Sequence, residues 1–334
     1  MLRVVVRRLL QMVLTLFVLS ALMFVWLRNL PGGPISAMLG ERATPERIAQ
    51  LRHALGYDQP IWFSYGKWLG RMATGNFGNS SSSGRPIGAE LAEAFPGTIE
   101  LSFFALLFAI GLGIPLGYLA ARFHGRILDS AIVIGTLVGV SVPVFFLGYL
   151  LKQGAAVELA WFPPSGRADV TLDATHVTNF FVLDGLLTRE WDVAADALIH
   201  LVLPALTLGT IPLAVIVRIT RASVLDVLNE DYVRTAEAKG LRNPTIRGRH
   251  ILRNALLPVV TAIGLQTGLL LAGAVLTERV FNFRGLGFLL AEGISQRDYP
   301  RLQAIILLAA FVYVLVNLLV DLSYAVIDPR VRVR

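Results

Sequence analysis

The histidines and carboxylates of this chain lie at spacings that match no common active site. His53, His124, His176, His200 and His250 are scattered, and no His-Glu-x-x-His pair exists that would hold a zinc ion. The chain also lacks the Walker loop that binds ATP phosphates and the Gly-x-Ser-x-Gly turn of serine hydrolases. We therefore predict no catalytic site, and no metal or cofactor bound by this chain.

The acidic residues give two further candidates. Those in the segment 152–197 fit no loop of oxygen ligands for a cation, and we interpret them as a solvated face. They are Asp169, Asp173, Asp184, Glu190, Asp192 and Asp196. Asp321 is the one acid well inside an apolar stretch, whereas Glu100 and Asp129 lie at the ends of others. A carboxylate at the centre of a membrane costs about 3 kcal/mol, so we expect Asp321 to have a structural partner or a functional role.

Charged residues, glycine and proline are concentrated in residues 231–258, which read DYVRTAEAKGLRNPTIRGRHILRNALLP. Tyr232–Lys239 contains good helix formers, and Gly240 can adopt the positive φ that ends a helix. Asn243-Pro244 begins a second short helix, and Leu257-Pro258 starts the next apolar stretch. The basic face of that second helix consists of Arg247, Arg249, His250 and Arg253. Such a shape would present a compact knob to a cytoplasmic partner; a basic loop attracted to anionic lipid is the alternative.

The first of these two helices also carries three small residues, Thr235, Ala236 and Ala238. A surface of small side chains lets a helix approach another protein closely. We therefore expect Thr235 and Ala236 to seat the helix in a groove of its partner.

The composition places the chain among membrane proteins. Of its 334 residues, 55% are hydrophobic and only 16% are charged, which is too apolar for an ordinary soluble domain. The net charge of +7 does not indicate nucleic-acid binding, because the cations lie between apolar blocks. The chain has no cysteine, so a disulfide framework is excluded.

Six apolar blocks are each long enough to cross a bilayer as a helix. They cover residues 9–28, 98–121, 128–151, 198–217, 255–276 and 302–326. The first block is longer than a signal-peptide core, so we interpret it as a retained span. Lys and Arg gather in the segments that are cytoplasmic if the N-terminus is cytoplasmic. The sequence thus predicts an all-α integral membrane protein with about six transmembrane helices and both termini in the cytoplasm.

Small residues and prolines within the blocks predict close packing and bends. Three sets of small residues recur at four-residue spacing, which favours close helix packing. They are Gly113 with Gly117, Gly135 with Gly139, and Gly264 with Gly268 and Ala272. We interpret all three sets as contacts between helices of this chain. For the last set, a contact with another subunit is the alternative. Prolines that would bend helices around a pathway are Pro115, Pro143, Pro204 and Pro212.

We divide the chain into residues 1–28 (N-terminal tail and first span), 29–97 (an external subdomain) and 98–334 (a core with five spans). The core includes an external loop, 152–197, and a cytoplasmic loop, 218–254. In the external subdomain, Thr44-Pro45-Glu46 predicts the start of a helix that stops at Gly56. A second helix is expected at Ile61–Met72 with Trp62, Tyr65, Trp68 and Leu69 on one face, followed by a flexible tip at Ser80–Ser83.

Residues 231–258 resemble the cytoplasmic coupling loop of ABC-importer permeases, where a Glu-Ala-Ala triplet precedes a glycine and, later, Leu-Pro. Here the triplet is Arg234-Thr235-Ala236, and Gly240 and Leu257-Pro258 follow. The arginine and the longer spacing depart from the general motif, but they are features of the dipeptide/oligopeptide/nickel subfamily. Other stretches resemble its first (B-type) permease: LGYDQP at 55–60, GNFGNS at 75–80, HLVLPALTLG at 200–209, ERVFNFRGLG at 278–287, RDYP at 297–300 and DLSYAVIDPRV at 321–331. The segment 152–197 resembles this type of permease least.

This resemblance implies a transmembrane permease subunit of an ATP-driven peptide importer in the cytoplasmic (inner) membrane of a prokaryote. The implied partners are a second homologous permease, one or two ABC ATPase subunits, an external substrate-binding protein and the lipid bilayer. ATP and Mg would be used by the ATPases, so the chain itself would not be an enzyme. The residues implied in ATPase coupling are Asp231, Tyr232, Arg234, Thr235, Ala236, Lys239, Gly240, Leu257 and Pro258.

Other functions remain open at this level. An ion-coupled secondary transporter would show inverted repeats and ionisable residues at the membrane midplane, and this sequence shows no clear repeat and almost no such residues. A membrane enzyme would need a catalytic set, which is missing. Within the family, nickel chelates, glutathione and haem are alternatives to peptides as substrate.

Overall fold

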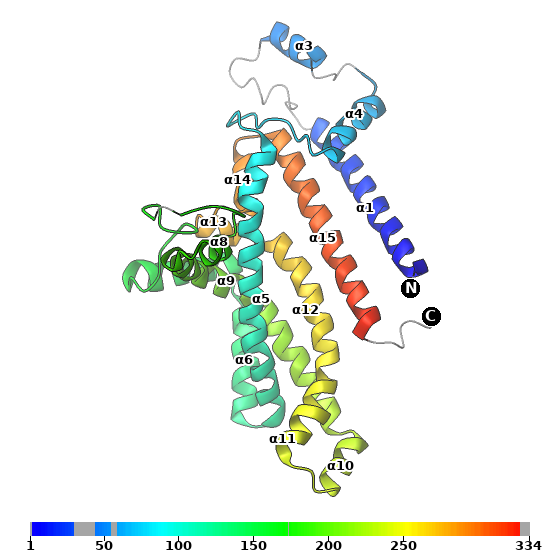
Figure 1. The fold of residues 1–334 in the computed structure, drawn as a ribbon, viewed down its shortest axis with the longest axis vertical. Coiled ribbons are helices and arrows are strands. Elements are labelled where there is room, and N and C mark those ends of the chain that lie inside the picture. The colour runs from blue at the N-terminus through cyan, green and yellow to red at the C-terminus, as the bar shows by residue number, and fades with distance from the viewer. Residues whose placement is uncertain (1, 30–43, 55–58, 173, 328–334) are drawn as a thin grey trace.

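The computed structural model describes residues 2–29, 44–54, 59–172 and 174–327. Every regular element in these ranges is a helix, and Asn79 and Pro86 form an isolated antiparallel bridge. The predicted all-α fold is therefore confirmed for the described residues. The molecule is elongated, with α3 (Pro45–Ala54) and α4 (Ile61–Ala73) at one end and α10 (Asp231–Ala238) and α11 (Asn243–Thr245) at the other (Figure 1).

Two long helices, α5 (Ile87–Arg122) and α9 (Trp191–Leu228), form the centre of the fold. Gly113 and Gly117 let their backbones approach closely. A β-carbon at Gly113 would lie 2.7 Å from a methyl carbon of Ile216, and one at Gly117 would lie 2.6 Å from Thr220 Cβ. The helices run on without a break through their prolines, Pro96, Pro115, Pro204 and Pro212.

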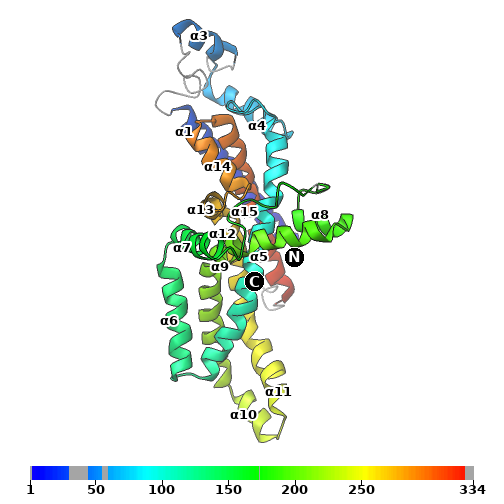
Figure 2. The same ribbon diagram turned by 90° about the vertical axis from the view of Figure 1, so that its left-hand side faces the viewer.

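The apolar block at 128–151 is not one continuous helix, contrary to the sequence prediction. α6 (Ile127–Ser141) is followed at 99° by α7 (Val144–Leu151), which continues into the π-helix η2 (Lys152–Glu158) (Figure 2). Pro143 has no N–H to continue the helix and disfavours helical backbone at the preceding residue. Val142 is accordingly extended, with φ −80° and ψ 126°, so the bend predicted at Pro143 is confirmed.

The second layer consists of α12 (Arg253–Gly273), α15 (Tyr299–Ile327) and α1 (Leu2–Arg28), with α15 between the other two. Gly264 allows α12 to approach α15, because a β-carbon there would lie 2.5 Å from a methyl carbon of Val320. Gly268 faces Tyr313 and Asn317 of α15. The helices α13 (Val275–Val280) and α14 (Leu286–Ser295) connect α12 to α15.

Not every predicted packing glycine packs. Gly135 and Gly139 of α6 have no heavy atom within 4 Å of the position a β-carbon would occupy. The close packing expected of this pair is therefore not found within the chain, because a groove separates these glycines from α5 and α9. The side chains of Ala272 and Asp321 lie outside the described part of the structure, although α12 and α15 include these positions.

The number of spans agrees only in part with the prediction. Four described helices are long and apolar enough to cross a membrane: Val6–Arg28, Ile87–Arg122, Trp191–Leu228 and Tyr299–Val320. The bent pair of α6 and α7 would make a fifth. α12 lies where a further span was predicted, but it does not meet the same criteria over its described residues. The total of six and the cytoplasmic position of both termini stay predictions.

Two short helices lie on the predicted external side. α3 begins as expected, with the Thr44 hydroxyl accepting a hydrogen bond from Arg47 N at 3.3 Å; the expected stop at Gly56 lies outside the described residues. In α4, Tyr65, Trp68 and Leu69 pack against Met23, Phe24 and Leu27 of α1. Trp62, by contrast, is 75% exposed and does not share this face. The segment 152–197 adds α8 (Phe181–Thr188).

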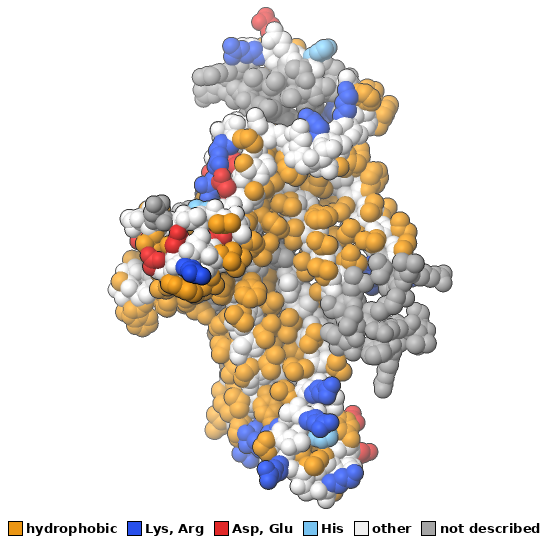
Figure 3. All heavy atoms as spheres, viewed as in Figure 1, with side chains coloured by type: hydrophobic (Ala, Val, Ile, Leu, Met, Phe, Trp, Pro, Cys, Tyr) orange, Lys and Arg blue, Asp and Glu red, His pale blue; other side chains and the backbone are white. Residues whose placement is uncertain are grey.

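The surface pattern fits a membrane protein. Figure 3 shows hydrophobic side chains covering the middle of the molecule, while Lys and Arg gather around α10 and α11 at its lower end. The apolar belt and the helix lengths together support a multi-pass membrane protein.

Candidate functional site

The predicted helix, glycine turn and second helix at 231–258 are all present. α10 ends at Ala238, and Gly240 follows with φ +71°. The chain then forms α11 and the π-helix η3 (Ile246–Leu252), which runs directly into α12. The result is a knob, here defined as residues 229–252, which projects beyond the ends of α5 and α6 (Figure 1).

The knob has its own small hydrophobic core. Val233 and Ala236 of α10 are 1% and 5% exposed. They pack on Ala121 of α5, Val224 of α9, and Ile246, Ile251 and Ala255 of the segment that follows. The expectation that Ala236 faces a partner is therefore wrong: residues three apart lie on the same side of a helix, so Ala236 follows Val233 inward. The small side chain holds α10 against its own scaffold.

The outward face of α10 carries most of the other residues predicted for coupling. Asp231, Tyr232, Arg234 and Thr235 are exposed, as are Lys239 and Gly240 just beyond the helix. The Asn254 amide donates a hydrogen bond to the Tyr232 hydroxyl at 3.0 Å, which ties α10 to α12. Leu257 and Pro258 are exposed on α12 and do not belong to the knob's core. The structure thus separates the predicted set into a knob face, one core residue and a dipeptide on α12.

An ion pair secures the scaffold under the knob. The Arg221 guanidinium of α9 donates to both carboxylate oxygens of Asp129, at 2.6 and 2.8 Å. Asp129 also accepts a hydrogen bond from Gly125 N at 3.0 Å, and it faces His124. The pair joins the turn between α5 and α6 to α9, so Asp129 has a structural partner.

A second buried ion pair was not foreseen from the sequence. Arg167, in the poorly matching segment 152–197, lies 3.2 Å from the Glu100 carboxylate, and both side chains are 6% exposed. The guanidinium also donates to the backbone oxygens of Asn179 and Glu93 and lies 3.9 Å from the Phe181 ring centre. No local spacing distinguishes Arg167 in the sequence, because its nearest partner along the chain, Asn179, is 12 residues away and Glu100 is 67.

The acidic residues of the segment 152–197 do not all lie on a solvated face, contrary to the sequence prediction. Asp184 is buried and accepts hydrogen bonds from the backbone N–H groups of Val177, Thr178 and Asn179. It thereby orders the loop in front of α8. Among the described residues, no cluster of histidines and carboxylates has the arrangement of a metal site.

Glu278 is a completely enclosed carboxylate, with a relative exposure of 0%. One oxygen accepts from the Thr98 hydroxyl at 2.6 Å, and the other accepts from Phe288 N at 2.8 Å. Because Phe288 lies in the first turn of α14, Glu278 caps that helix from a distance. Burial raises the pKa of Glu278 to about 7, although these hydrogen bonds oppose the rise.

Two glycines make this cap possible. A β-carbon at Gly285 would lie 2.5 Å from the Glu278 carboxylate carbon, and one at Gly287 would lie 2.5 Å from Val275 Cα. The stretch ERVFNFRGLG therefore contains both the carboxylate and the glycines that admit it. This was the sequence signal for Glu278, but the resemblance alone did not reveal the role.

The predicted flexible tip at Ser80–Ser83 is wrong, because Asp298 holds it. The Ser80 and Ser82 hydroxyls and the Ser81 and Ser82 N–H groups all donate to the Asp298 carboxylate. Burial would raise the pKa of Asp298, but these hydrogen bonds outweigh it and lower the pKa. Arg301 completes the cluster, since its guanidinium lies 2.9 Å from Glu90 and 3.1 Å from Glu292.

Family models and known relatives match this chain along nearly its whole length. Residues 113–333 match the family model "Binding-protein-dependent transport system inner membrane component", and residues 1–102 match the N-terminal model of the same systems. The chain is 45% identical to the di/tripeptide transport system permease protein DppB of Pseudomonas aeruginosa, over 333 residues and 99% of each chain.

Two further relatives have comparable coverage. The dipeptide transport system permease protein DppB of Escherichia coli is 45% identical over 336 residues, again 99% of each chain. The glutathione transport system permease protein GsiC of the same species is 40% identical over 332 residues and 99% of each chain.

Proposed function

Because this chain belongs to the binding-protein-dependent transport system inner membrane components, we propose that it forms one half of a peptide pathway through the membrane. Its relatives named for dipeptide and di/tripeptide transport are 41–45% identical to it, against 40% for one named for glutathione. Peptides are therefore the favoured substrate, and glutathione, itself a small peptide, is the alternative. Family membership leaves no support for an ion-coupled secondary transporter.

The partners follow from this assignment as proposals. A second, homologous permease completes the pathway, one or two ABC ATPases supply the energy, and an external binding protein delivers the substrate. ATP and Mg belong to the ATPases, and this chain binds neither. The external subdomain at 29–97 contacts the binding protein or caps the pathway.

The observation that carries the coupling proposal is the construction of the knob. Its core of Val233, Ala236, Ile246 and Ile251 packs against the ends of α5 and α9. A push on the exposed face of α10 is therefore passed directly to the two longest helices of the fold. A basic loop that only touched lipid would need no such core, which favours a protein partner over the lipid alternative.

Gly240 supplies the sharpest test. Its φ of +71° is a conformation in which a β-carbon costs about 1–2 kcal/mol, so Gly240→Val should displace the end of α10. We expect the variant to assemble with the ATPases but to lose most of the stimulation of ATP hydrolysis by substrate-loaded binding protein. Uptake of a labelled dipeptide should fall in parallel, and competition by unlabelled glutathione distinguishes the two substrates.

Gly248→Val is the matched control. Gly248 lies in the same knob, has no positive φ, and has no heavy atom within 4 Å of the β-carbon position. Gly248→Val should keep normal stimulation of ATP hydrolysis by substrate-loaded binding protein. Normal stimulation in Gly240→Val as well would show that the knob does not transmit ATP hydrolysis.

A further inference from the structure

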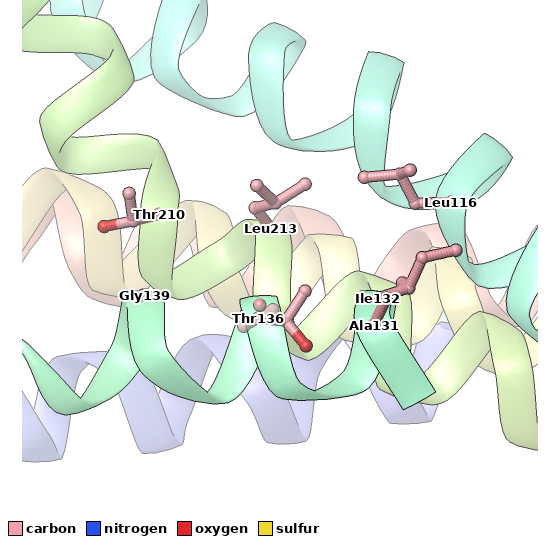
Figure 4. Close-up of a pocket in the computed structure, with 9 residues that line it drawn as sticks. Leu116, Ala131, Ile132, Thr136, Gly139, Thr210 and Leu213 are labelled. Atoms are coloured by element: carbon pink, nitrogen blue, oxygen red, sulfur yellow. The ribbon is translucent and has the colours of Figure 1, made fainter. Parts of the chain in front are cut away.

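A groove of about 360 Å³ lies between α5, α6 and α9, on the face that exposes Gly135 and Gly139. Leu116 of α5, Ile132 of α6 and Leu213 of α9 converge on it (Figure 4). These residues are half-buried, and Gly135 is exposed, so the groove is open at the surface. Without side chains on the two glycines, the middle of α6 leaves room for a ligand.

The groove offers a ligand no free hydroxyl donor. Its only hydroxyls belong to Thr136 and Thr210, and both donate to backbone oxygens of their own helices. The acceptors are Val133 O at 2.9 Å and Thr207 O at 2.8 Å. An occupant must therefore be hydrocarbon along this length.

The size of the groove suits one leaflet of a bilayer. Its α6 residues run from Ala131 to Gly139, which is about 12 Å at a rise of about 1.5 Å per residue. Half of a hydrocarbon core of about 30 Å is about 15 Å. The groove begins close to the turn between α5 and α6, which the distribution of Lys and Arg places on the cytoplasmic side.

Three exposed arginines lie within about two helical turns of that end of the groove, counted along their own chain segments. Arg126 immediately precedes α6, Arg122 ends α5, and Arg218 lies in the last third of α9. Arg122 and Arg126 both lie against the Phe123 ring, at 5.3 and 5.8 Å from its centre. Along their helices the three are about 6–9 Å from the nearest groove residue. No ion pair engages them within the described ranges, whereas their neighbour Arg221 is held by Asp129.

From these observations we propose that the groove binds an acyl chain of an anionic phospholipid, whose headgroup is held by Arg122, Arg126 and Arg218. The positive charge of these three arginines favours a lipid over a protein as the occupant of the groove. A neighbouring membrane subunit follows the same positive-inside rule and would bring further cations, whereas an anionic lipid of the cytoplasmic leaflet brings the opposite charge. This site is separate from the knob and does not depend on which substrate is transported.

The test compares two sets of variants in the complete complex. Gly135→Leu combined with Gly139→Leu places side chains in the groove, and nothing lies within 4 Å of either β-carbon position. Replacing Arg122, Arg126 and Arg218 by Gln removes the charge. The complex is purified in detergent containing phosphatidylcholine and a minor fraction of phosphatidylglycerol, and retained lipids are counted by native mass spectrometry. We expect wild type to retain phosphatidylglycerol preferentially and both variants to lose that preference several-fold.

Controls match each change. Gly111→Leu places the same side chain on an open face of α5, and Arg47→Gln, Arg52→Gln and Arg71→Gln remove three cations from α3 and α4. Both controls should retain phosphatidylglycerol as wild type does. If the arginine variant kept the preference, the headgroup assignment would be refuted even if the glycine variant lost it.

A single cysteine provides a readout that does not depend on purification. The chain has no native cysteine, so Gly139→Cys can carry the only fluorophore in a cysteine-free complex. Brominated phosphatidylglycerol should quench it more strongly than brominated phosphatidylcholine at equal content. Equal quenching by both lipids, or a cross-link from Gly139→Cys to another subunit in place of quenching, would overturn the proposal.

Discussion

Glu278 illustrates how a single residue determines the geometry of a distant helix. Its carboxylate joins Thr98 of α5 to the first turn of α14 and is completely enclosed. A buried carboxylate without such partners would be strongly destabilising. The hydrogen bonds reduce this cost but do not abolish it, which is why the pKa of Glu278 stays at about 7.

This pKa predicts a pH dependence of stability. The ordinary pKa is 4.5 and the folded value is about 7, so the folded protein holds the proton more tightly than the unfolded chain. The stabilisation from Glu278 is complete below about pH 4.5, falls as the pH rises towards about 7, and is constant above that. The melting temperature of the purified complex should therefore decrease between about pH 5 and 7.

Glu278→Gln should flatten that decrease, because glutamine resembles the protonated acid and cannot titrate. Replacing the exposed Glu158 by Gln should leave the wild-type profile unchanged. If Glu278→Gln and wild type showed the same profile, the proton would not be held at Glu278.

At the scale of elements, the contact between α5 and α9 is the central packing feature of the fold. Gly117 faces Thr220 Cβ and Val217 O at distances of 2.6 and 2.7 Å from a β-carbon position. Backbone atoms on the opposite helix cannot rotate away, so any side chain forces the helices apart. Overpacking of this kind costs about 1–3 kcal/mol.

We therefore expect Gly117→Val to lower the melting temperature and the yield of folded complex. Gly111→Val, on an open face of the same helix, should have little effect and controls for the loss of glycine. Thermal unfolding followed by size-exclusion chromatography measures both. Equal melting temperatures for the two variants would mean that α5 and α9 are not in close contact at Gly117.

For the whole molecule, the proposal that this chain supplies half of a pathway makes a prediction about assembly. α1 exposes large apolar side chains on several sides, among them Leu10, Val13 and Leu22, and packs chiefly against α15. Produced with the ATPases but without a second permease, the tagged chain should show no uptake of labelled dipeptide in proteoliposomes. Addition of the homologous permease should restore it, and transport by a homodimer would contradict the prediction.

The sequence alone determined the class of the protein, because these features are local. Apolar runs of span length, Gly240 at a helix end and Thr44 before Pro45 act within a few residues, and the all-α fold, the glycine turn and the cap were predicted from them. The resemblance to peptide-importer permeases likewise depended on short stretches that could be quoted as they stand.

The tertiary structure decided what depends on contacts between distant residues. It turned Ala236 inward, placed Asp298 under the Ser80–Ser83 segment and brought Glu278 to α14. It also left Gly135 and Gly139 uncovered although Gly113 and Gly117 have the same spacing. Spacing shows only which residues share a helix face; whether a neighbouring helix or an open groove meets that face is determined by how the helices pack.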